Sequence, residues 1–280
     1  MLNSQTAESV IDHALSLGAD FAELFVEKNE TNVVSTLSDE VQSVESGINF
    51  GIGLRLVYGT KVLYGYTNKT DQDELRRIAS VLAAKDLRDP VSHMKSFDFN
   101  QISDIHPARR ILSVNAEIES KVAYLMAADR TARAEGEQIS QTRGSCMQRE
   151  QRIEIFNSEG LHTSDNRNYI RTSLTAIASA AGEQATGSWN DGGLLGWEIE
   201  AAINPEKTGE EAARQALVNL TAKPCPSGRM PVIIGNGFGG VIFHEACGHL
   251  LETTSVAKKA SVFHDQMGEM IASSIVNAVD

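Results

Sequence analysis

The sequence is poor in cysteine, with only Cys146, Cys225 and Cys247 scattered over 280 residues. Small secreted domains that depend on disulfides carry an even set of cysteines at short spacings. An odd and scattered set excludes a disulfide framework, so we expect a reducing, cytoplasmic location. Cys146 and Cys225 belong to no motif, and we interpret both as structural residues.

Long apolar runs are missing as well. No segment approaches the ~18 consecutive apolar residues of a membrane-spanning helix. The start of the chain, MLNSQTAESVIDHALSLGAD, has neither the basic region nor the apolar stretch of a secretory signal. We therefore expect no membrane partner.

Positive charge is the third deficit. The chain has 25 Lys and Arg against 37 Asp and Glu, which gives a net charge of -12 and a pI of about 5.1. Binding along a nucleic-acid backbone needs clustered basic residues, and the sequence shows neither a basic stripe nor a helix-turn-helix pattern. We expect no nucleic-acid partner, and we interpret the acidity as ordinary solubility.

The first half of the chain alternates between helical and strand periodicity. Helical spacing over residues 5–17, and again after a capping residue at Thr70, predicts two helices. Between them, alternating apolar residues predict strands at residues 21–27, 32–37, 41–45, 52–58 and 61–66. Sequential strands joined by short turns are typical of an antiparallel sheet.

The second half repeats this order. An apolar stripe from Ile111 to Leu125 predicts a helix that ends near Gly136, and strands follow within residues 138–190. A capping box at Thr208–Glu211 predicts another helix, and residues 230–235 predict a short buried strand.

These patterns predict an α+β fold with mostly antiparallel sheets and flanking helices. We expect an N-terminal domain at residues 1–95, an irregular linker at residues 96–108 and a second domain at residues 109–280. Residues 272–280 are largely apolar and lack a stop signal or polar tail, so the second domain is expected to be incomplete.

The stretch GNGFGGVIFHEACGH, residues 235–249, combines two site patterns. Its glycines fit the G-x-G-x-x-G of a dinucleotide-binding loop. However, the acidic residue that should hold a ribose ~20 residues later is absent, and most of the chain precedes the motif. We interpret the glycines as a tight turn, in which Gly237, Gly239 and Gly240 are candidates for hydrogen bonding an extended peptide.

The second pattern is H-E-x-x-x-H, formed by His244, Glu245 and His249. Histidines at i and i+4, as in the zinc-protease motif H-E-x-x-H, lie ~40° apart around a helix, whereas i and i+5 lie ~140° apart. Either the two histidines do not share a metal, or the helix is irregular between them. A π-type turn restores a common side, and the interior glycine Gly248 indicates such a turn at residues 246–248.

Glu245 stands between apolar residues, and burying it without a partner would be costly. A metal, or a water polarised by one, would compensate. Glu252 is three residues past His249, so we expect it to orient the imidazole or, alternatively, to bind the metal. Cys247 points ~160° away from His249 in a regular helix, which favours core packing, and His264 is interpreted as a surface residue.

Residues 239–263, GGVIFHEACGHLLETTSVAKKASVF, resemble the signature of the TldD/PmbA family of bacterial zinc metallopeptidases, in its TldD branch. The segments GADFAELFVE and VESGINFGIGLRLVYG are similar to the family's N-terminal domain. The resemblance therefore covers nearly the whole chain and is most specific at its H-E-x-x-x-H motif.

The resemblance implies zinc as the cofactor, His244 and His249 as its ligands, and Glu245 as the general base. It also implies a cysteine as third ligand, which we expect beyond Asp280 because family members are longer; this chain alone would then lack activity. The implied substrates are short or unfolded peptides, processed during maturation or turnover. The implied assembly is a dimer of identical or paralogous subunits that encloses them.

Two other functions follow from the same resemblance. The protein is alternatively a non-hydrolytic subunit that pairs with an active paralogue, although the intact motif argues against this role. Regulation of a DNA-acting enzyme attaches to the family through its naming, and the acidic sequence offers nothing in its support.

Overall fold

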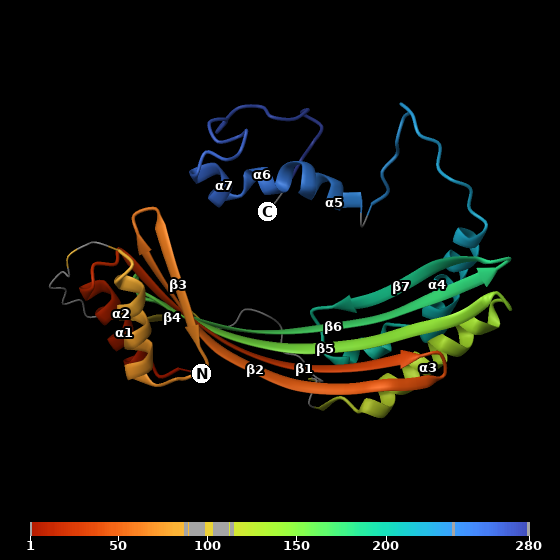
Figure 1. The fold of residues 1–280 in the computed structure, drawn as a ribbon, viewed down its shortest axis with the longest axis horizontal. Helices are drawn as coiled ribbons and strands as arrows, with labels where there is room; N and C mark the ends of the chain where they lie inside the picture. Colours follow the sequence, from red (N-terminus) through yellow and green to blue (C-terminus); the bar gives the residue numbers. More distant parts are fainter. Residues whose placement is uncertain are drawn as a thin grey trace. The chain divides into compact units, whose positions relative to one another are not determined.

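Long antiparallel strands form the frame of the protein in a computed structural model that describes residues 2–86, 89, 99–102, 112, 115–236 and 239–278 (Figure 1). In chain order the first elements are α1 (Ser4–Ser16), β1 (Phe21–Leu37), β2 (Glu40–Tyr58), β3 (Lys61–Thr67), α2 (Gln72–Ala83) and β4 (Asn100–Ile102). They are followed by α3 (Ile118–Ala134), β5 (Ile139–Asn157), β6 (Leu161–Ala180), β7 (Glu183–Gly193), a 3₁₀ turn η2 (Trp197–Ala201) and α4 (Pro205–Leu220).

The strands make one seven-stranded sheet in the order β3-β2-β1-β5-β6-β4, with β7 also paired to β6. Every pairing is antiparallel except that of β4 with β6. The expected α+β fold with an antiparallel sheet and flanking helices is confirmed.

The helices pack on one side of this sheet, as the alternation of buried side chains shows. On β1, Leu24 and Val26 join the core beneath α1 and α2, whereas Val34 joins the core beneath α3. These residues all point to the same face because alternate residues of a strand share a face. Most side chains on the opposite face are half-buried or exposed, with Ile153 and Asn157 of β5 as buried exceptions.

Two predicted helix starts are wrong by a few residues. Asp71 caps α2 in place of Thr70, because its carboxylate accepts the backbone N–H of Glu74 at 3.0 Å. Asn204 caps α4 ahead of the expected capping box, and Pro205 takes the first turn, where its missing N–H costs nothing. Thr208 is therefore buried inside α4.

The chain divides into two compact units, residues 1–223 and 224–280. The sheet joins β1 and β2 to β5 and β6, so strands from both sides of the expected linker at residues 96–108 pair within the first unit. Most of that expected linker lies outside the described residues.

The second unit holds the short helices α5 (Gly240–Phe243), α6 (His249–Leu251) and α7 (Thr253–Ala257), and the π-helical turn η4 (His244–Gly248). The strand expected at residues 230–235 is wrong: the segment is irregular, and Ile233 is 98% exposed. A strand needs a neighbour to accept and donate its backbone hydrogen bonds, and no described strand pairs with this segment.

Candidate metal centre

The candidate site lies on a short continuous helix in which α5, η4 and α6 follow one another without a break. All five residues from His244 to Gly248 belong to the π-helical turn, and the flanking Phe243 and His249 keep right-handed helical backbone angles. The expected π-type turn is therefore confirmed. Its extra residue per turn is what a spacing of five between the histidines requires.

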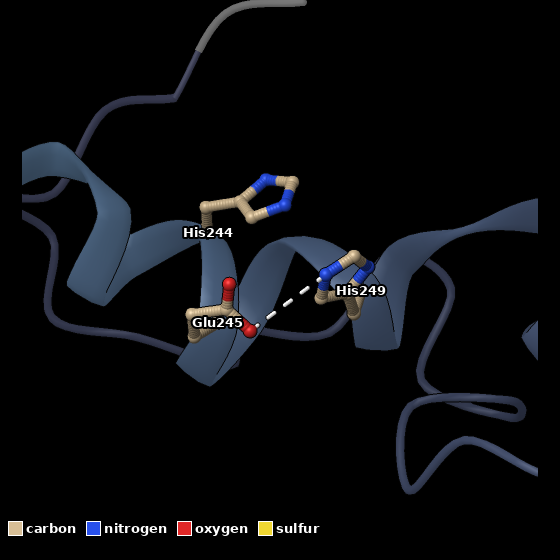
Figure 2. Close-up of side chains that lie close together, drawn as sticks. All are labelled: His244, Glu245 and His249. Atoms are coloured by element: carbon tan, nitrogen blue, oxygen red, sulfur yellow. Dashed lines mark ion pairs between the residues drawn. The ribbon is translucent and has the colours of Figure 1, made fainter.

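This turn brings the two histidines together. Their ring centroids are 4.3 Å apart, with the ring planes at 64° to each other. Ligand atoms of His244, Glu245 and His249 all lie within 4.8 Å of one another, and Figure 2 shows the three side chains on neighbouring turns. They form the one group of three or more metal-ligating residues found in the described part of the chain.

Gly248 leaves room for the first imidazole. A Cβ atom at this position would lie 3.3 Å from Nδ1 of His244 and 3.7 Å from its Cγ. A contact at 3.3 Å is tighter than nine in ten real Cβ contacts, so a Cβ here would require the ring to move by a few tenths of an ångström. The glycine that looked unusual in the sequence thus has a definite steric role.

Glu252 holds the second imidazole. Its Oε1 lies 2.7 Å from Nδ1 of His249, so the carboxylate accepts a hydrogen bond there and leaves Nε2 directed elsewhere. That hydrogen bond is the main reason that the pKa of His249 is raised, with smaller contributions from the charges of Glu252 and Glu245. Nε2 of His249 forms an ion pair at 3.7 Å with Oε2 of Glu245, drawn as the dashed line in Figure 2.

Glu245 is exposed, although most of its neighbours in the sequence are apolar. Its side chain is 64% exposed, and that of His249 is 50% exposed. Burial depends on what packs over a residue, and Ser261 is the one buried residue among those described in the second unit. Glu245 therefore carries no buried charge for a metal to compensate, and the feature that indicates a metal is the proximity of the three side chains.

The other predicted residues take different positions. Cys247 is half-buried and does not join the histidine group, and His264 is exposed, as expected. Gly239 and Gly240 begin α5, whereas Gly237 lies outside the described residues.

Ser261 makes a contact to the candidate helix that the sequence did not indicate. Its hydroxyl donates to the backbone carbonyl of Leu250 at 2.5 Å and accepts the backbone N–H of Phe263 at 3.0 Å. The loop after α7 is thereby tied to the helix turn that carries His249. The available signal in the sequence was a serine between two apolar residues, Ala260 and Val262.

Sequence profiles of one family match most of the chain. The profile of the PmbA/TldA metallopeptidase domain 1 matches residues 22–85, that of the central domain matches residues 113–220, and that of the C-terminal domain matches residues 227–280. The candidate site lies in the last of these ranges.

Curated relatives carry metalloprotease names. A metalloprotease TldD homolog of Haemophilus influenzae is 28% identical over all of this chain and 59% of its own length. A metalloprotease of Methanocaldococcus jannaschii is 24% identical over all of this chain and 61% of its own length. The chain therefore spans about three fifths of the length of these relatives.

Solved structures share the fold. A Thermotoga maritima protein described as a candidate modulator of a DNA gyrase superposes with a TM-score of 0.72 at 16% identity, over 95% of this chain and 59% of its own. TldE from Thermococcus kodakarensis superposes with a TM-score of 0.64 at 13% identity, over 93% of this chain and 58% of its own.

None of the helices in the described part of the chain combines the length and apolar character needed to cross a bilayer.

Proposed function

The chain belongs to the TldD/PmbA family of metallopeptidases, and on that premise we propose that it carries the catalytic helix of a zinc-dependent peptidase acting on short or unfolded peptides. The supporting observation is the π-helical turn that gathers His244, Glu245 and His249 within 4.8 Å. Sequence spacing alone would have placed the histidines on nearly opposite sides of a regular helix.

The donor set fits zinc. Imidazole nitrogens are preferred zinc ligands, and the carboxylate of Glu252 on Nδ1 of His249 is the kind of outer partner that fixes a ligating imidazole. His244 and His249 would hold the ion, which when bound supplies a Lewis acid that polarises a peptide carbonyl and acidifies a water molecule.

Glu245 is the proposed general base. Its carboxylate is exposed and lies beside Nε2 of His249, the nitrogen that would face the ion. A water molecule beside the ion would therefore also be within reach of this carboxylate. Glu245 would take a proton from that water and return it to the leaving amine. Catalytic zinc sites use three protein ligands, and the histidine group here supplies two. We propose that a cysteine beyond Asp280 completes the set.

Substitution of Glu245 tests this role. In the complete gene product, Glu245→Gln should keep its zinc content and lose at least about 100-fold in peptide cleavage, since a general base contributes about 10² to 10⁴ in rate. Glu269→Gln, at an exposed position of the same unit, is the matched control and should cleave as the unsubstituted protein does. Unchanged cleavage by Glu245→Gln would rule the mechanism out.

The second candidate function is a non-hydrolytic subunit that pairs with a paralogue and encloses peptides. The supporting observation is that the two-histidine group falls one ligand short of a catalytic zinc site. Elemental analysis of the complete gene product separates the two functions: about one zinc per chain supports the peptidase, and its absence supports the partner subunit. The dimer and its cytoplasmic location remain part of the proposal, and the three free cysteines support that location.

A further inference from the structure

Among the described residues of the first unit, the helices pack on one face of the sheet and none packs on the other. The alternation on β6 continues from Asn168 to Ala178, with buried side chains toward α3 and α4 and partly exposed ones on the other side. Figure 1 shows β6 and β7 side by side with α4 packed close to them. The side chains of Arg167, Tyr169 and Arg171 belong to the uncovered face because they alternate with the buried residues.

A groove of about 660 Å³ is present on this face where β7 ends beside β6. Met147, Tyr169 and Leu194 contribute apolar walls, and Arg167 and Arg171 contribute guanidinium groups. A volume of this size lies within the usual range for ligand sites, which runs from roughly 300 to 1,000 Å³.

Three arginines surround Tyr169. Arg149, its partner across β5 and β6, places its guanidinium carbon 4.6 Å from the centre of the tyrosine ring. Arg167 and Arg171 lie two residues before and two residues after Tyr169 on the same strand. Arg167 and Arg171 are therefore about 13 Å apart along the strand, and Arg149 places a third guanidinium beside Tyr169, at the middle position. The three positive groups together recur at about 7 Å, the two-residue repeat of an extended chain.

The hydrogen-bonding capacity of these arginines is only partly used. The Nε of Arg149 is buried and has no hydrogen-bond partner among the described residues. Arg171 donates one bond to the amide oxygen of Asn190 at 2.9 Å, and Arg167 pairs with Asp165 at 2.5 Å. A guanidinium has five N–H donors, so each of the three retains donors for a ligand.

The acidic residue that lines the groove does not neutralise them. The carboxylate of Asp191 accepts hydrogen bonds from the indole of Trp189 at 3.1 Å and the hydroxyl of Thr208 at 3.3 Å. Thr208 belongs to α4, so this carboxylate is turned toward the helix-covered face. Asp165 offsets the charge of Arg167, and Arg149 and Arg171 leave the groove locally positive on a chain whose net charge is -12.

We propose that this groove binds an extended peptide segment that carries acidic side chains at alternate positions. Side chains two apart on an extended peptide point the same way, and their spacing matches that of the guanidinium groups of Arg167, Arg149 and Arg171. The apolar walls would contact the stems of the peptide side chains. That such a peptide is also a substrate rests on the proposed function. Binding of the peptide in the groove does not depend on that function.

A peptide fits this surface better than a nucleic acid does. Nucleic-acid binding draws on a broad field of positive charge, whereas this chain is acidic overall and three arginines meet at the groove. Aliphatic walls such as Met147 and Leu194 suit side-chain stems and leave a phosphate backbone without partners. A nucleic acid is the competing ligand, and the experiment tests it beside the peptide.

Fluorescence anisotropy tests the proposal with the complete gene product carrying Glu245→Gln, which prevents consumption of the peptide. The probe is a labelled peptide with blocked ends and Glu at three alternate positions in a Ser background. Its isomer with three consecutive Glu has the same charge and composition. We expect the alternate peptide to bind roughly tenfold more tightly than the isomer, and a Gln analogue to show no measurable binding.

Arginine substitutions then locate the site. Arg149→Gln and Arg171→Gln should each weaken binding of the alternate peptide roughly tenfold, because each removes a charged donor. Arg214→Gln, which makes the same change of charge on the exposed surface of α4, should leave the affinity unchanged. Arg167 is kept because its substitution would release the carboxylate of Asp165 two residues away on the same strand, whereas Glu211, which Arg214→Gln would release, lies on α4 and does not line the groove.

Several results would overturn the proposal. Equal binding of the two isomers removes the spacing argument, and equal weakening by Arg214→Gln shows a general effect of charge. A single-stranded DNA oligonucleotide that competes through Arg149 and Arg171 at lower concentration than the peptide assigns the groove to nucleic acid. If the alternate peptide binds but the unsubstituted protein cleaves no peptide, the groove is supported as a peptide-binding site and the proposed peptidase function is contradicted.

Discussion

At the scale of single residues, the site depends on how many residues separate two histidines. His249 is five positions after His244, a spacing that suits a π-helical turn, and that turn is present. The conflict between this spacing and a regular helix was visible in the sequence, so the local backbone was predictable. The exposure of Glu245 was not, because it depends on which distant residues cover the helix.

Gly248 gives the first prediction at this scale. Gly248→Ala should weaken zinc binding several-fold, because the added Cβ would lie 3.3 Å from the ring of His244 and displace it. Helix content should not fall, since alanine is favoured over glycine in a helix by about 1 kcal/mol. Zinc affinity is measured by competition with a chelating dye, and helix content by circular dichroism.

Gly240→Ala is the control for that substitution. It makes the same chemical change on the same helix, at a position where a Cβ meets nothing within 4 Å. Its zinc affinity should match that of the unsubstituted protein. Equal loss in both variants would show that the effect comes from the backbone rather than from crowding of His244.

At the scale of elements, the strands are longer than their apolar patterns. The sequence predicted separate strands at residues 21–27 and 32–37, whereas β1 is continuous from Phe21 to Leu37. The polar middle of β1 pairs with an equally polar middle of β5, and Lys28 faces Arg152 while Glu30 faces Glu150. Backbone hydrogen bonds form regardless of side-chain polarity, so hydrophobic alternation underestimates such strands.

The contact between α3 and α4 also escaped the sequence analysis. Gly209 allows the two helices to approach closely, because a Cβ there would lie 2.4 Å from the carbonyl oxygen of Ala128 and 2.9 Å from the amide nitrogen of Ala132. Neither atom belongs to a flexible side chain. A glycine inside a helix gives no sequence signal that distinguishes close packing from simple tolerance.

Gly209→Ala should therefore destabilise the first unit. Overpacking of a well-packed contact costs about 1 to 3 kcal/mol, which exceeds the gain of about 1 kcal/mol in helix propensity at the upper end of that range. Because backbone must move here, we expect a net loss of about 1 to 2 kcal/mol in the free energy of unfolding. Urea titration followed by tryptophan fluorescence measures it.

Gly47→Ala provides the comparison on β2, where a Cβ meets nothing within 4 Å. It shares the loss of unfolded-chain entropy that any Gly→Ala change brings, so its stability should stay the same or rise slightly. A Gly209→Ala variant as stable as Gly47→Ala would contradict the close packing of α3 on α4.

At the scale of the whole molecule, the two units differ in what holds them together. The first unit contains three clusters of buried apolar residues. In the second unit, Ser261 is the single buried residue within residues 224–236 and 239–278. Periodicity could not reveal this difference, because Val232, Ile233 and Ile234 form as apolar a run as many buried strands.

Hydrogen exchange measured by mass spectrometry should reproduce this difference in the 280-residue chain. We expect the slowest amides in β5 and β6, which are paired on both sides along much of their length. Amides of residues 224–278 should exchange orders of magnitude faster, because local opening exposes no buried apolar core. Protection of residues 244–251 equal to that of β5 would contradict this account.

The measurement that tests the account most directly is zinc X-ray absorption of the complete gene product. If the π-helical turn directs both histidines to one ion, the spectrum will show two imidazole nitrogens at about 2.0 to 2.1 Å from zinc. The spectrum of each single variant, His244→Ala or His249→Ala, will then show one imidazole nitrogen bound to zinc. A single imidazole in the unsubstituted protein, or an imidazole count that does not change in either variant, would contradict a shared metal.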